Sequence, residues 1–122
     1  MIKKLLVALL LISPVSFADW GDVYYCQMTS LVSTDADGIV TQYKLQKFQF
    51  KLDEAKKSMV FGTSGYFKNS EQPLVLDRSF PNIETWRASD SFSTLHFKDG
   101  KFFYASVVFG IIGSISADCD KF

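Results

Sequence analysis

Histidine, arginine and cysteine are scarce in this 122-residue chain, which holds one histidine (His96), two cysteines and two arginines (Arg78 and Arg87). A zinc site takes four ligands, and two thiols with one imidazole are too few. We therefore expect no metal and no cofactor. The formal net charge is zero at pH 7. Because recognition of phosphate groups requires clustered basic side chains, the sequence argues against nucleic-acid binding.

Proline and glycine are also rare, with three and seven residues respectively. That excludes collagen-like and low-complexity chains, and 48% hydrophobic residues exclude intrinsic disorder. A membrane-spanning helix needs about 20 consecutive apolar residues. The apolar run Ala105–Ile115 is shorter and contains Gly110 and Gly113, so we expect a buried strand there and no transmembrane segment in the mature chain.

The first eighteen residues have the composition of an export signal. Lys3 and Lys4 form a basic start, Leu5–Ile12 is an apolar stretch, and Ser16-Phe17-Ala18 is a small-x-small cleavage site. The sequence thus predicts a signal peptide over residues 1–18 and a periplasmic or secreted mature protein. A short uncleaved anchor is the alternative interpretation.

The remaining residues, 19–122, are about 104 in number, which is enough for one small domain with one core. Both cysteines, Cys26 and Cys119, lie in this part. An exported chain meets an oxidising compartment, so we expect them to form a structural disulfide. A redox-active pair would show Cys-x-x-Cys spacing, which is absent here.

Apolar residues alternate with polar ones through most of the domain, which is typical of antiparallel strands. We expect an all-β fold: a small antiparallel barrel or strongly curved sheet of about seven to eight strands, arranged much like a meander. The disulfide would join its N- and C-terminal strands. The expected strands are Asp22–Ser33, Ile39–Asp53, Met59–Thr63, Leu74–Phe80, Ile83–Ser89, Phe92–Lys98, Lys101–Phe109 and Ile111–Cys119.

Local turn chemistry adds detail to this fold. Asp99-Gly100 supplies the two positive φ angles of a type I′ hairpin turn, which would place Phe97 opposite Phe102. The apolar residues of Ile39–Asp53 change from odd to even positions, which predicts a bulge near Gln46-Lys47. Pro81-Asn82 indicates a further turn.

No group of residues indicates catalysis. Ser91, Ser93 and Thr94 are the hydroxyl residues close to His96 in sequence. Nucleophilic catalysis also needs a third group that orients the histidine base, and the sequence indicates none. The acidic residues gather in turns, where they are solvated. Ser33–Gly38 overlaps the start of a calcium loop, but its expected final ligand position holds a lysine, so we interpret it as a turn. We therefore expect a non-enzymatic protein with no catalytic residues.

Aromatic residues are the one excess, with eleven Phe, five Tyr and two Trp after the signal. They either fill a small core or line a cavity, since a barrel of about eight strands can hold one small ligand. The residues expected to contact such an apolar ligand are Tyr43, Phe48, Phe50, Phe61, Trp86, Phe97, Phe102 and Tyr104.

Short segments at the two ends, Tyr25-Cys26 and Asp118-Cys119, together with Ser64-Gly65-Tyr66 and Phe97–Gly100, resemble the periplasmic inhibitors of C-type lysozyme. Their spacing differs from that family's Ser-Gly-x-x-Tyr and aromatic-x-Lys-Gly segments. The resemblance implies an exported β-barrel that inserts a loop into the cleft of a hydrolase.

Two functions are therefore open. The first is a binding module of the cell envelope with an apolar small ligand. The second is a module that interacts with an envelope or extracellular protein, such as a hydrolase inhibitor. The second would act through an exposed loop that contains Ser64, Gly65, Tyr66 and Lys68. The sequence leaves the oligomeric state open.

Overall fold

The structure is a computed structural model that describes residues 18–80 and 83–122 and does not describe the side chains of residues 78–83. The expected signal peptide, except Ala18, and the Pro81-Asn82 turn lie outside the described residues. Within those residues there is no helix, and so none that is long and apolar enough to cross a membrane.

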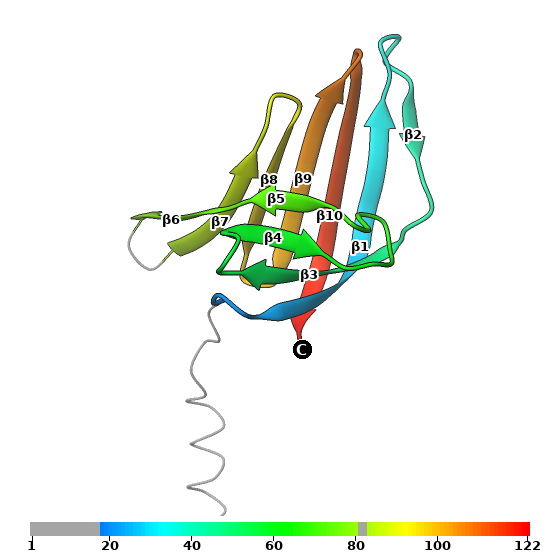
Figure 1. The fold of residues 1–122 in the computed structure, drawn as a ribbon. Helices are drawn as coiled ribbons and strands as arrows, with labels where there is room; N and C mark the ends of the chain where they lie inside the picture. The colour runs from blue at the N-terminus through cyan, green and yellow to red at the C-terminus, as the bar shows by residue number, and fades with distance from the viewer. Residues whose placement is uncertain (1–17, 81–82) are drawn as a thin grey trace, which may run out of the picture.

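The fold is all-β, as expected, and forms a nearly closed antiparallel barrel (Figure 1). Nine strands follow the order β5-β4-β3-β1-β10-β9-β8-β7-β6, and β2 pairs separately with β1. The strands are β1 (Val23–Thr34), β2 (Val40–Gln42), β3 (Lys47–Asp53), β4 (Ser58–Phe61), β5 (Glu71–Pro73), β6 (Val75–Phe80), β7 (Ile83–Ser89), β8 (Ser93–Lys98), β9 (Lys101–Val108) and β10 (Ile111–Lys121).

The strand count exceeds the expected seven to eight for two reasons. The segment expected as one strand, Ile39–Asp53, forms β2 and β3 on either side of residues 43–46, close to the expected bulge. The Gln46 carbonyl accepts a hydrogen bond from the Met28 amide across this break. The other addition is the short polar strand β5, which lies in a region expected to be a loop.

Strand β1 changes its inward-facing side part-way along its length. Met28 pairs with Ala117 but Ser30 pairs with Ser116, so Thr29 is an extra residue. Such a bulge shifts the side-chain alternation by one position. Even-numbered residues such as Cys26 and Met28 are buried before it, and the odd-numbered Leu31 is buried after it.

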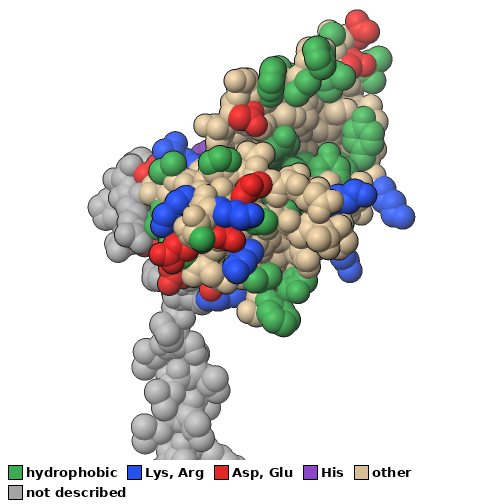
Figure 2. All heavy atoms as spheres, in the orientation of Figure 1, with side chains coloured by type: hydrophobic (Ala, Val, Ile, Leu, Met, Phe, Trp, Pro, Cys, Tyr) green, Lys and Arg blue, Asp and Glu red, His purple; other side chains and the backbone are tan. Residues whose placement is uncertain are grey.

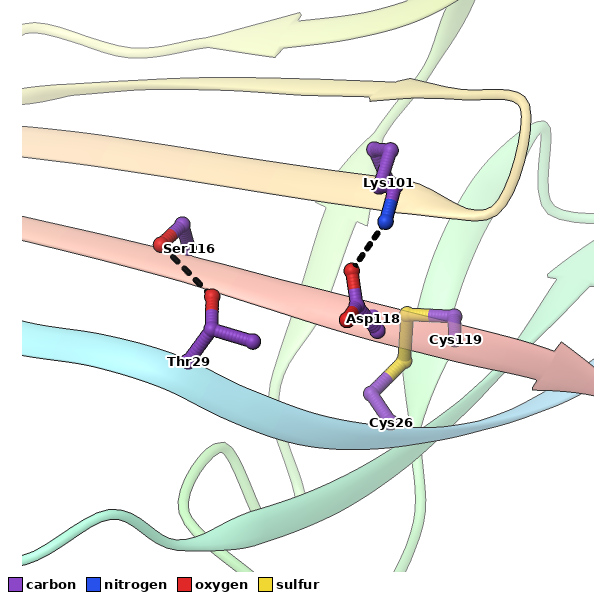
Figure 3. A network of polar contacts seen from close by, with 6 residues as sticks. All are labelled: Cys26, Thr29, Lys101, Ser116, Asp118 and Cys119. Carbon is purple, nitrogen blue, oxygen red and sulfur yellow. Dashed lines mark hydrogen bonds and ion pairs between the residues drawn. A yellow bond between two sulfur atoms is a disulfide. The ribbon is translucent and has the colours of Figure 1, made fainter.

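The expected disulfide joins Cys26 of β1 to Cys119 of β10, which are direct partners in the strand register (Figure 3). Beside it, Lys101 forms an ion pair with Asp118. Thr29, the bulged residue, forms a hydroxyl–hydroxyl hydrogen bond of 2.9 Å with Ser116. The bridge ties the first strand to the last, and it indicates a non-cytoplasmic location.

Two turns have the same backbone shape. Asp99-Gly100, between β8 and β9, has positive φ at both residues, and Phe97 lies opposite Phe102 as expected. Phe109-Gly110, between β9 and β10, also has positive φ at both residues. Phenylalanine is an unusual residue in this conformation, which normally favours Gly, Asn or Asp.

Aromatic rings fill the closed part of the barrel. Phe50, Phe97 and Phe102 are almost fully buried, with ring centroids 5.0 Å apart for Phe50–Phe97 and 6.1 Å for Phe50–Phe102. The Phe50–Phe97 contact is edge-to-face, and such contacts contribute beyond simple apolar burial. The closed part of the barrel therefore has a packed core.

The other end is open. Figure 1 shows β1, β9 and β10 rising beyond the layer formed by β3, β4 and β5, with β2 beside them. We call this the open end, and define it as residues 29–43, 89–94 and 103–116. The tips of two hairpins meet there, because a Cβ added at Gly110 would lie 3.8 Å from Cβ of Ala36. Here the inner face of the sheet is uncovered.

Candidate functional site

A hollow with a volume of about 290 Å³ lies on the inner face of the open end. It is bounded by β1, β9 and β10, by the break between β2 and β3, and by the loop between β4 and β5. We call it the tyrosine hollow. Its lining residues are Leu31, Val32, Ser33, Tyr43, Gln46, Tyr66, Tyr104, Ser106, Gly113, Ser114 and Ile115.

The hollow exists because the inward-facing positions of β9 and β10 at this level hold small side chains, which leave space unfilled. Gly113 of β10 pairs with Ser106 of β9, and a Cβ built on Gly113 would come within 3.0 Å of Ser106 Oγ. Below them, Tyr104 pairs with Ile115. The bulge at Thr29 supplies the third wall, because it directs Leu31 inward. Three neighbouring strands thus leave one space.

Three tyrosines approach one another around this space. Burial raises the pKa of Tyr66, and the neighbouring Tyr104 and Tyr43 raise it further. The hydroxyl of Tyr43 lies 3.0 Å from that of Ser33, which fixes the ring at the rim. No lining residue is Asp, Glu, Lys, Arg or His. The hollow is therefore uncharged at neutral pH, with aromatic faces and hydroxyl groups as its recognition elements.

The structure divides the eight expected ligand-contacting aromatics into two groups. Tyr43 and Tyr104 line the hollow. The other six are buried in the core and belong to one cluster: Phe48, Phe50, Phe61, Trp86, Phe97 and Phe102. The bulge expected in Ile39–Asp53 would have placed Tyr43 on the same buried face as Phe48 and Phe50. Tyr43 is instead 52% exposed, because residues 43–46 lie between β2 and β3 and do not form a strand.

The expected interaction loop is exposed and firmly held. Ser64, Gly65, Tyr66 and Lys68 are all exposed. The amide of Tyr66 donates to the Lys47 carbonyl, and that of Lys68 to the Gly65 carbonyl. Gly65 has a φ of 95°, and a Cβ there would lie 2.7 Å from the Lys47 carbonyl oxygen. Only Tyr66 of these four lines the hollow.

Sequence reasoning missed the small residues of the site. No motif marks Ser33, Ser106 and Gly113 as ligand-contacting residues, and Ser33 was interpreted as the start of a turn. They matter because they lie at the same level of three paired strands and line the hollow. A glycine within an otherwise β-forming run was the one available signal, since it often marks a close approach or a space for a ligand.

The rim above the hollow is strongly apolar. Phe109, at the β9–β10 turn, is 98% exposed. The other exposed apolar residues around it are Ile39, Val40, Val107, Val108, Ile111 and Ile112. Together with Phe109 they form what we call the apolar tip. By strand alternation Val108 and Ile111 face inward and Val107 and Ile112 face outward, so the tip presents apolar groups on both sides of the β9–β10 hairpin. Clustered exposed apolar groups mark interaction surfaces.

His96 lies apart from the hollow. It is exposed, and its register partners are Arg87 and Phe103. It shares a shallow depression with Thr94, among other residues. Ser93 Oγ instead donates to the carboxylate of Asp90 at 3.1 Å.

Comparison of the chain with protein-family models, with curated proteins and with solved structures found no match.

Proposed function

We propose that this protein is an exported, non-enzymatic binding module whose tyrosine hollow holds an uncharged, partly apolar small molecule. The observation that carries the proposal is a hollow of about 290 Å³ with no ionisable lining residue other than tyrosine. Ligand sites are typically concave, mostly apolar spaces of roughly 300–1,000 Å³ with a few polar groups that orient the ligand. The hollow is close to the lower limit, which suits a single small molecule.

The polar groups of the hollow define the ligand further. Ser33, Ser106 and Ser114 present hydroxyl groups on its walls, and Tyr43 adds its own. Hydroxyls both donate and accept hydrogen bonds, whereas a charged ligand would lose its hydration here without gaining a counter-ion. A neutral ring with one or two polar substituents fits best.

Export is the second part of the proposal. Residues 1–18 have the composition of a signal peptide, and the Cys26–Cys119 bridge supports an oxidising compartment. We place the mature protein, residues 19–122, in the periplasm or outside the cell.

The second candidate function is a protein-interaction module, such as a hydrolase inhibitor, that acts through the loop of Ser64, Gly65, Tyr66 and Lys68. The observation in its favour is that this loop is exposed yet held to β3 by the Tyr66–Lys47 hydrogen bond. A preorganised loop loses little entropy on binding. The two functions differ in which residues binding depends on.

The test uses the uncharged dye Nile red as a probe, because its fluorescence rises in an apolar site. Gly113→Val places a side chain in the hollow, and the Ser106 hydroxyl, 3.0 Å from the new Cβ, has to rotate away to admit it. Valine otherwise suits a strand. Tyr43→Ala removes one wall. We expect wild type to bind the dye, and both variants to bind it about tenfold more weakly.

The matched control is Tyr25→Ala, since Tyr25 is also half exposed but is not part of the hollow. It should bind the dye as wild type does. Equal dye binding by wild type and Gly113→Val would contradict the proposal. Loss of binding to a hydrolase on substitution of Lys68, with dye binding intact, would favour the second candidate.

A further inference from the structure

The open end differs in charge from the rest of the molecule. Its three segments, 29–43, 89–94 and 103–116, contain Asp35, Asp37 and Asp90 but none of the thirteen lysine and arginine residues. Figure 2 shows this end with hydrophobic and acidic side chains, while the blue basic side chains lie lower on the same face. In residues 19–122 the open end holds three acidic and no basic side chains, whereas the remainder holds ten acidic and eleven basic ones.

The carboxylates at this end are held in place by their own turns. Asp35 Oδ1 accepts hydrogen bonds from the amides of Asp37 (2.9 Å) and Ile39 (3.0 Å). Asp90 Oδ1 accepts from the amides of Phe92 and Ser93, both at 2.8 Å, and these bonds lower the pKa of Asp90. The carboxylates of Asp35 and Asp90 therefore have fixed positions at the open end.

The apolar tip is also strained. Phe109 has a φ of 52°, which costs an ordinary L-residue free energy, and its ring is almost completely exposed. At the equivalent turn between β8 and β9 the chain places Asp99. An aromatic ring that is 98% exposed and held in an unfavourable backbone conformation gains little from packing within the fold, which points to contact with another molecule.

We infer that the apolar tip docks into an apolar hollow on a partner protein whose rim carries lysine or arginine. Phe109 is the anchor, because exposed aromatic side chains that enter a partner's pocket dominate binding free energy. Asp35, Asp37 and Asp90 match the basic rim. A second copy that docks through its own open end and an anionic membrane both present negative charges to these carboxylates, and they are the competing occupants.

The probe is a fluorescein-labelled amphipathic peptide of 14 leucine and lysine residues, compared with a peptide in which glutamate replaces every lysine. Binding is measured by fluorescence anisotropy. We expect wild type to bind the lysine peptide about tenfold more tightly than the glutamate peptide, with a difference that shrinks in high salt.

Three variants make the test specific. Phe109→Asn suits the turn and removes the anchor, so we expect lysine-peptide binding about tenfold weaker. Phe122→Asn is the control, because Phe122 is 89% exposed in the C-terminal region, outside the open end, and it should leave binding unchanged. The triple variant Asp35→Asn/Asp37→Asn/Asp90→Asn keeps the turn acceptors and should abolish the preference for lysine.

Several outcomes would overturn the inference. Equal affinity for the two peptides would contradict the basic rim on the partner. Unchanged binding of the lysine peptide by Phe109→Asn would contradict the role of Phe109 as the anchor. Sedimentation of a dimer that Phe109→Asn dissociates would identify a second copy as the occupant. Phe109-dependent binding to phosphatidylglycerol vesicles, with no preference for the lysine peptide, would identify a membrane.

Discussion

At the scale of single residues, Phe109 and Asp99 occupy the same position in two hairpin turns with positive φ, yet only aspartate suits it. Replacing Phe109 with Asn should therefore stabilise the protein, by about 1 kcal/mol, because asparagine tolerates this conformation. Urea unfolding of wild type and Phe109→Asn measures the difference. A less stable variant would show that the ring supports the fold, contrary to its exposure.

Tyr24 makes the stability depend on alkaline pH. Burial, with a smaller effect from Asp22, raises its pKa to about 12 in the folded protein. Below pH 10 both folded and unfolded chains carry the proton, but above it the unfolded chain loses its proton first. The free energy of unfolding should therefore fall as the pH rises, by about 1 kcal/mol between pH 9 and pH 11 from this group.

Tyr24→Phe is the matched variant, since it removes the titrating hydroxyl and keeps the ring. Urea unfolding at pH 9 and pH 11 should show a smaller loss of stability for Tyr24→Phe than for wild type. The same loss in both proteins would show that Tyr24 does not control this dependence.

At the scale of elements, β9 shows how strand alternation separates core from surface. Phe102 is fully buried among aromatic rings, whereas its neighbour Phe103 is 51% exposed. Phe102→Ala should lower the free energy of unfolding by about 3–5 kcal/mol. Phe103→Ala should change it by about 0.5 kcal/mol or less. Chemical denaturation tests both, and similar losses would mean that the register of β9 is wrong.

The elements that could be predicted are those with local chemical signals. Asp99-Gly100 specified its turn, and alternation specified most strands. Strand β5, Glu71–Pro73, was missed because it is short and polar and exists only through its pairing with β4. Turn propensity and hydrophobic period carry no information about such long-range pairing.

The candidate site was predicted only in part, for a related reason. Tyr43 and Tyr104 were expected, but their role depends on Thr29, whose insertion turns the end of β1 inward, and on Gly113 opposite Ser106. A shift of one residue reverses which side chains face the interior. A packed aromatic core and an aromatic-lined ligand cavity both produce an excess of aromatic residues, so the sequence could not distinguish between them.

At the scale of the whole molecule, the disulfide joins strands whose cysteines are 93 residues apart in sequence. The bridge should stabilise the fold by about 4–5 kcal/mol in the chain-entropy treatment, because it lowers the conformational entropy of the unfolded chain. Cys26→Ser/Cys119→Ser should lower the free energy of unfolding by roughly that amount. A change below about 1 kcal/mol in guanidinium unfolding would show that pairing of β1 with β10 suffices alone.

The molecule as a whole combines a closed barrel, filled by its own aromatic rings, with an open end that carries both the tyrosine hollow and the apolar tip. The packed part holds the strands rigid, so small residues at the open end can leave a space without loss of the fold. We therefore propose that the packed part serves stability and that the open end serves binding.

Native mass spectrometry, compared with denaturing mass spectrometry, tests this central claim most directly. The mature protein is purified without detergent from an oxidising compartment, alongside Gly113→Val. We predict that wild type carries an additional small mass that denaturation removes, that Gly113→Val lacks it, and that both show the two-hydrogen deficit of the disulfide. An additional mass retained equally by Gly113→Val, or none on wild type with Nile red also excluded, would contradict the account.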